Sequence, residues 1–167
     1  MSDIIGKIFL IPIACVLLYI LPAMIIATKQ DDISQGMIDK AVVSFVDNAK
    51  ATGKVSPEQY ITMCNDIDKT GLQCHISLIV SKKFAIPQGN RYETLHEDYI
   101  KEEITEEMFP STGENKDYLL KHGDYIEVEV KNTAPSLGLK LANMLYQRKT
   151  DNVVYTTYGG YVGNIPQ

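Results

Sequence analysis

The sequence predicts an α+β protein in which a long N-terminal helix joins a small head, built on an antiparallel sheet with two or three helices. The run from Ile8 to Ala27 contains no charged residue, and an amphipathic stretch continues it without an intervening proline. The chain after residue 53 alternates helical and strand-like patterns, separated by polar turns. We therefore divide the 167 residues into a short N-terminus (1–7), a transmembrane helix (8–28), an amphipathic helix (29–53) and the head (54–167).

Composition and charge narrow the class of protein. Charged residues make up 22% of the chain and are missing from the apolar run, so the remaining chain is clearly polar. This distribution excludes a plain cytosolic domain, a multi-span membrane protein and a disordered chain. The formal net charge of -5 argues against nucleic-acid binding, because no basic face offsets the repulsion from phosphates.

The apolar run has the length of a membrane span. At ~1.5 Å per residue it gives roughly 30 Å of helix, the thickness of the hydrocarbon core. A signal peptide cleaved after Ala27 and a buried core helix are the alternatives, and the nearly neutral segment Met1–Lys7 favours a retained anchor. Charge gives little bias in orientation, because Lys7 precedes the run and Lys29 follows it. The expected anchor residues are Ile8, Phe9, Pro12, Leu17, Leu18, Pro22, Ile25 and Ile26.

Apolar residues recur at helical spacing after the run. This pattern predicts one helix from about Ile8 to Lys50, closed by Gly53 in a left-handed conformation. The prolines within the apolar run predict either an ordinary bend or a helix that opens locally. The stripe that we expect to pack on the head consists of Ile33, Met37, Ala41, Val42, Phe45 and Val46.

The head carries clear helix starts and one clear strand. Ser56 and Pro57 begin a helix that ends near Gly71, because serine caps helices well and proline suits the first helical position. The alternation of Asp124–Lys131 predicts a half-buried antiparallel strand with Ile126, Val128 and Val130 on its apolar face. The other expected elements are a strand at Leu72–Ser81, a loop at Lys82–Asn90, an extended segment from Tyr92 that becomes helical between Ile100 and Phe109, a helix capped by Thr133 or Ser136, and a strand at Asn152–Tyr158 with a turn at Gly159–Gly160 and a return through Tyr161 and Val162.

No set of residues predicts catalysis, a metal or a cofactor. The three histidines are isolated, and the chain has no HExxH, CxxC, phosphate-binding glycine loop or GxSxG. The acidic stretch Glu93–Glu107 is interpreted as a solvated face, with a weak cation site or a patch for an electropositive partner as the alternative. Tyr155, Tyr158 and Tyr161 are expected to pack on strands or to make subunit contacts. We therefore expect a non-enzymatic protein.

The cysteines leave two possibilities open. Cys64 lies on the predicted second helix and Cys74 on the strand that follows, at levels that suit either a disulfide or two buried free thiols. Cys15 lies within the apolar run and is expected to be an apolar filler.

This layout resembles that of type IV pilins and pseudopilins. The stretches AVVSFVDNAKATGKVSPEQY (41–60) and GDYIEVEVKN (123–132) also look like uncharacterised membrane-anchored proteins of Gram-positive bacteria, which are associated with tight-adherence (Tad) or type IV pilus-like gene clusters. Pilin precursors carry a basic leader, a cleavage glycine and a glutamate five residues later. Gly6 could be that glycine, but Lys7 follows it and Ile11 occupies the glutamate position.

The resemblance implies a pilin-like fold and a cell-surface or secretion-apparatus subunit, better matched to a minor or unprocessed component than to a major pilin. It also implies an extracytoplasmic head and three kinds of partner: the lipid bilayer, other copies or related pilin-like subunits, and assembly-platform proteins. The rival hypotheses are a single-pass accessory or sensor module whose head binds a partner protein or small ligand, and a cleaved secreted enzyme.

Overall fold

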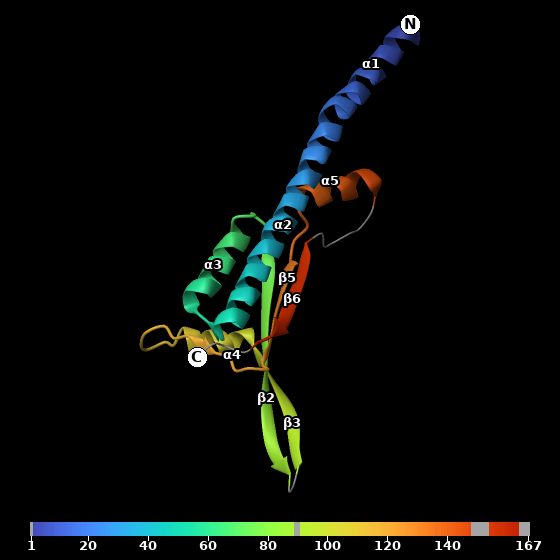
Figure 1. Ribbon diagram of the computed structural model, residues 1–167. Coiled ribbons are helices and arrows are strands. Elements are labelled where there is room, and N and C mark those ends of the chain that lie inside the picture. Colours follow the sequence, from blue (N-terminus) through green and yellow to red (C-terminus); the bar gives the residue numbers. More distant parts are fainter. Residues whose placement is uncertain (1, 89–90, 148–153, 164–167) are drawn as a thin grey trace.

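The protein is described by a computed structural model that covers residues 2–88, 91–147 and 154–163 and has the expected α+β architecture (Figure 1). A long N-terminal helix runs past the head and packs along one side of it with its C-terminal half. The elements are α1 (Ser2–Cys15), the π-helical segment η1 (Val16–Ile20), α2 (Leu21–Thr52), β1 (Lys54–Val55), α3 (Pro57–Asp68), β2 (Cys74–Gln88), β3 (Arg91–Ile100), α4 (Lys101–Met108), β4 (Tyr118–Leu119), β5 (Tyr125–Asn132), α5 (Leu137–Tyr146) and β6 (Tyr155–Tyr161).

We call α1, η1 and α2 together the long helix, because the backbone stays helical from Ser2 to Thr52. Pro12 lies inside α1, and Pro22 is the second residue of α2, just after η1. Proline lacks the N–H that an α-helix uses, and its ring crowds the carbonyl four residues earlier, so a local wide turn is a natural accommodation. The long helix ends where the sequence predicts it, with Gly53 in the left-handed region (φ 67°) and its N–H bonded to the carbonyl of Ala49.

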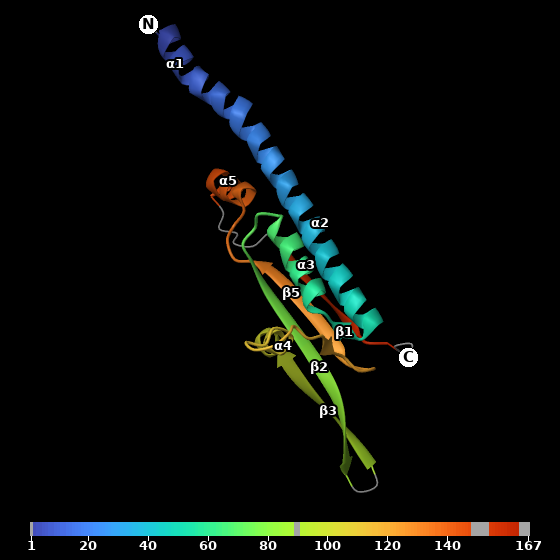
Figure 2. The same cartoon turned by 90° about the vertical axis from the view of Figure 1, so that its left-hand side faces the viewer.

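The head contains a four-stranded antiparallel sheet of order β3-β2-β5-β6 and a small β1-β4 pair. The predicted alternation of β5 is confirmed, because Ile126, Val128 and Val130 are fully buried. These residues face the core beneath α2, with Leu78 and Val80 of β2. Figure 2 shows α2 and α3 side by side along the sheet.

The loop predicted at Lys82–Asn90 is wrong over most of its length. Residues 82–88 continue β2 and pair with β3, for example Lys83 with His96, so the two strands form a hairpin that projects beyond the rest of the sheet (Figure 1). Pro87 argues against a strand in the sequence, but residues 82–88 pair with β3 alone, and proline is tolerated where one side of a strand is unpaired. Residues 89–90 lie outside the described chain. The predicted change from extended to helical near Ile100 is confirmed by β3 and α4.

The turn predicted at Gly159–Gly160 is also wrong, since both glycines lie inside β6. A Cβ on Gly159 would lie 2.7 Å from the Tyr125 hydroxyl, and one on Gly160 would lie 3.0 Å from Lys50 Nζ. The glycines therefore permit close packing against β5 and α2 rather than a chain reversal. The predicted start of this strand at Asn152 lies outside the described residues.

Candidate membrane-spanning helix and its attachment to the head

The N-terminal part of the long helix exposes large apolar side chains on all its sides. Within the described residues, one helical stretch, Leu10–Thr52, is long and apolar enough to cross a membrane, and its apolar window is not buried in the head. Among the predicted anchor residues, Pro12 and Pro22 are exposed, and the side chains of Phe9 and Leu17 lie outside those described. The other four are also exposed: Ile8, Leu18, Ile25 and Ile26.

Burial begins at Asp31 and follows helical periodicity from there. The buried apolar residues of α2 are Ile38, Ala41, Val42, Phe45, Val46 and Ala49. Four members of the predicted stripe, Ala41, Val42, Phe45 and Val46, therefore do face the head.

The other two members of the predicted stripe, Ile33 and Met37, are corrected by the structure. They are 58% and 40% exposed. A row of residues spaced by four drifts around a helix by about 40° per step, because 3.6 residues make a turn. The row that includes Phe45 therefore turns away from the head towards its N-terminal end, at Met37 and Ile33. Ser34 and Ile38 are the residues that face the head there.

A polar cluster fastens α2 to β6. The side-chain amide of Gln35 donates to Asp39 Oδ1 at 2.7 Å and to Thr156 Oγ1 at 2.8 Å. The Tyr155 backbone N–H donates to Gln35 Oε1 at 3.2 Å, and the Thr156 hydroxyl donates to Asp39. These bonds fix the register of the helix on the strand. None of these bonds was predicted from the sequence, although a Gln–Asp pair four residues apart beside an apolar stripe was an available signal.

A second polar cluster lies one turn before the end of α2. Asp47 accepts hydrogen bonds from Lys50 Nζ at 3.0 Å and from the Tyr158 hydroxyl at 3.1 Å. The bond from Lys50 holds the pKa of Asp47 below its ordinary value. These contacts lie at the surface and contribute little stability, but they continue the line of attachment along β6.

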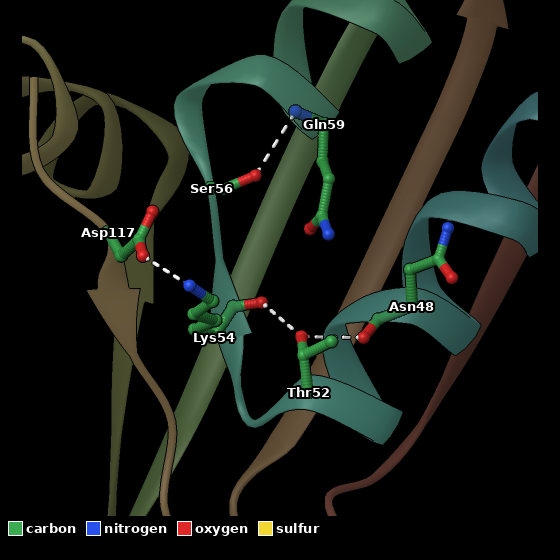
Figure 3. Close-up of polar contacts among 6 residues, drawn as sticks. All are labelled: Asn48, Thr52, Lys54, Ser56, Gln59 and Asp117. Atoms are coloured by element: carbon green, nitrogen blue, oxygen red, sulfur yellow. Dashed lines mark hydrogen bonds and ion pairs between the residues drawn. The ribbon is translucent and has the colours of Figure 1, made fainter.

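The corner between α2 and α3 is closed by local bonds (Figure 3). The Thr52 hydroxyl donates to the carbonyls of Asn48 and Lys54, and Lys54 Nζ lies 2.6 Å from Asp117 Oδ2. Ser56 caps α3 as predicted by accepting the Gln59 N–H at 3.3 Å. The chain reversal between the two helices is therefore well defined.

The junction between the exposed and packed parts of the long helix is formed by the start of α5. The Ser136 hydroxyl caps α5 by accepting the Leu139 N–H at 3.1 Å, and it donates to the buried Asp31 at 2.6 Å. A Cβ on Gly138 would lie 2.9 Å from the carbonyl oxygen of Ala27. Glycine thus lets α5 touch the backbone of α2 where the apolar run ends.

The cysteines are free thiols in the structure, so of the two open possibilities the disulfide between Cys64 and Cys74 is not formed. Both are half-buried, and burial raises the pKa of each thiol. Cys15 is exposed on α1.

The acidic stretch does not converge on one point. Part of it, with Glu97 and Asp98, lies on β3, and the rest lies on α4. Among the described residues no group of three or more His, Cys, Asp or Glu side chains is placed to hold a metal ion.

An open groove of about 520 Å³ runs between α2 and α3. Lys40, Glu58, Asp66 and Lys69 contribute charge to its walls, and Phe45 and Met63 contribute apolar surface. The side-chain amide of Gln59 points away from Ser56 towards the last turns of α2 (Figure 3). Its Oε1 is buried and has no hydrogen-bond donor among the described residues.

No family model matches the chain, and neither the curated proteins nor the solved structures contain a significant match.

Proposed function

We propose that this protein is a membrane-anchored, pilin-like subunit of a surface pilus or secretion apparatus, which acts by assembly and not by catalysis. Its long helix is held in the bilayer by residues 8–28. In an assembly, the same surface packs against other copies or related subunits, delivered by assembly-platform proteins.

The observation that supports this proposal is the uneven burial of one continuous helix. Its C-terminal half is built into the core of the head, whereas the part before Asp31 exposes apolar side chains around its whole circumference. A soluble monomer has nothing to cover that surface, but lipid and neighbouring helices of the same kind both do.

The free energy gained by covering these apolar side chains is large. Burying a large apolar side chain contributes about 1.5–3 kcal/mol, so sheltering the roughly ten that are exposed between Ile8 and Ile26 contributes on the order of 15–30 kcal/mol. This exceeds the whole folding stability of a typical domain, which is about 5–15 kcal/mol. The chain will therefore exchange one apolar environment for another rather than leave the long helix in water.

The head belongs outside the cytoplasm in this proposal, with a short N-terminus on the cytoplasmic side. The rigid attachment of α2 to β6 supports a role in assembly, because packing between long helices then fixes the positions of the heads. A flexible linker would transmit no such order.

The first experiment analyses the native protein in membrane fractions and in material sheared from the cell surface. Intact mass spectrometry is expected to find chains that retain the apolar run, either uncut or cleaved after Gly6, in both fractions. A dissolved monomer that begins at Thr28 contradicts the proposal. A chain confined to the membrane fraction contradicts assembly but not anchoring.

The second experiment places a charge in the middle of the apolar run. Leu18→Arg costs about 2.5–3.5 kcal/mol at the centre of a span and should release protein from membranes or prevent its insertion. Leu119→Arg is the matched control, because Leu119 is a similarly exposed leucine (67%, against 70% for Leu18) in the head. Equal membrane retention of both variants and the native chain contradicts anchoring by this helix.

The groove between α2 and α3 supports a second candidate function, that of a membrane-bound accessory or sensor module that binds a small ligand or partner segment. The support is the buried Gln59 Oε1, because an acceptor without a donor is a natural contact for a ligand N–H. Gln59→Leu should abolish binding of any ligand seen by thermal shift with the native chain. Unchanged shifts in that variant rule the groove out as the binding site.

A further inference from the structure

Helix α5 is the head element closest to the exposed part of the long helix. Both views show it at the end of the head that faces the N-terminus, extending sideways from α2 (Figures 1 and 2). Gly138 touches the backbone at Ala27, and Ser136 is bonded to Asp31. The start of α5 is therefore fixed at the level where the apolar run ends.

One face of α5 is apolar and uncovered. Leu141, Met144 and Leu145 follow the i, i+3, i+4 spacing that places side chains on one side of a helix. They are exposed by 37%, 83% and 43%. Lys140 is exposed on the flank of this face, and Tyr146 is exposed at the end of the helix.

The position of this face identifies what covers it. If residues 8–28 span a bilayer, Ala27 lies at the boundary between acyl chains and headgroups, and α5 begins at that same depth. A short amphipathic helix with a lysine at its flank and a tyrosine at its end has the composition of helices that lie in this boundary. The uncovered apolar face of α5 then belongs to a helix that begins at the depth where the lipid-facing surface of the long helix ends.

We propose that α5 is a second membrane contact, lying in the plane of the bilayer surface with Leu141, Met144 and Leu145 inserted among the acyl chains. This inference rests on the proposed anchoring of the long helix. Two contacts at fixed positions on one rigid body set both the depth of the long helix and the tilt of the head, which a single span leaves free to vary.

The absence of tryptophan from the sequence permits a direct test. The full chain is reconstituted into vesicles of neutral and anionic phospholipids as three variants, Met144→Trp, Leu119→Trp and Leu18→Trp, each of which carries a single tryptophan. All three positions are exposed, so the fold should tolerate the substitutions. Fluorescence is then measured with nitroxide-labelled lipids, which quench at a shallow or a deep position, and with aqueous iodide.

The expected result is a different environment for each probe. The tryptophan at position 18 should be quenched by deep nitroxides, and the control at position 119 by iodide. The one at position 144 should emit at shorter wavelength than the control, resist iodide and be quenched by shallow nitroxides, because interfacial helices lie about 5–10 Å into the boundary.

The outcomes separate the two proposals. Iodide quenching at position 144 together with deep lipid quenching at position 18 overturns the interfacial contact and leaves the anchor standing. Protection of position 144 from both lipid nitroxides and iodide also overturns it, since a second copy of the chain would then cover α5. Iodide quenching at position 18 contradicts the anchor itself.

Discussion

At the residue scale, the most specific contact is that of Gly138 with the long helix. A side chain there would meet Asp31 Oδ2 at 2.7 Å and the backbone of Ala27 at 2.9 Å, and the backbone of a well-packed helix cannot yield. Glycine is required at position 138 for packing and not for backbone conformation, since its φ angle is not positive.

Gly138→Ala should therefore destabilise the protein by about 1–3 kcal/mol, the usual cost of overpacking, despite the better helix propensity of alanine. Gly36→Ala is the control, because that glycine lies inside α2 with no atom within 4 Å of the added methyl. It should stabilise by about 0.5–1 kcal/mol. Urea unfolding in detergent micelles measures both changes, and a loss of stability in the Gly36 variant would contradict this account of the two sites.

Buried phenols and thiols predict a loss of stability at high pH. Desolvation raises the pKa of Tyr60, Tyr118, Cys64 and Cys74 above their unfolded values. The folded chain therefore binds more protons than the unfolded chain above about pH 9, and stability falls as pH rises through this range while it is fully present below it.

Tyr118→Phe should reduce that alkaline loss. Its hydroxyl is buried without a hydrogen-bond partner among the described residues, so its removal should not destabilise the protein near pH 7. Thermal unfolding between pH 7 and pH 11 compares the variant with the native chain. Tyr155→Phe serves as the control, because Tyr155 is exposed at the surface of β6. Identical pH profiles for Tyr118→Phe and the native chain would refute the role assigned to Tyr118.

At the scale of elements, the features that depend on neighbouring residues were predicted from the sequence, whereas contacts between separate elements were not. The Gly53 end of the long helix, the Ser56 cap and the alternation of β5 each depend on a few neighbouring residues, and the structure has all three. Lys83 of β2 pairs with His96 of β3, and Gly160 of β6 packs on Lys50 of α2, so each contact joins two separate elements. The pattern of one segment alone cannot reveal such pairs.

The attachment of α2 to β6 is another contact that the pattern of one segment does not reveal. Its hydrogen bonds allow a quantitative prediction. Asp39 and Thr156 are 117 residues apart and share one hydrogen-bond network with Gln35. A double-mutant cycle with Asp39→Ala and Thr156→Val should give a coupling free energy of about 0.5–3 kcal/mol, as expected for members of one network. A cycle pairing Asp39→Ala with Lys69→Ala, a lysine whose hydrogen bond is to Asp66 within α3, should give additive effects. Additivity in the first cycle would contradict the proposed attachment.

At the scale of the whole molecule, the folding unit does not coincide with the head as the sequence analysis divides it. The core cluster includes Ile38, Val42 and Phe45 of α2 together with residues from the sheet and from α3 and α4. The second half of α2 is therefore part of the core, whereas the part before Asp31 contributes almost no buried side chain among those described.

This division predicts opposite behaviour for two truncated chains. A fragment of residues 29–167 keeps every buried residue of α2 and should be a folded, water-soluble protein. A fragment of residues 54–167 loses six buried apolar residues of α2, worth on the order of 10 kcal/mol at about 1.5–3 kcal/mol for each large one, which is comparable with the stability of a whole domain. It should be unfolded or aggregated. Circular dichroism and size-exclusion chromatography distinguish the two, and cooperative unfolding of the shorter fragment would show that α2 only lies on the head. That result would also weaken the assembly proposal, because a helix that can leave the head cannot fix where the heads stand.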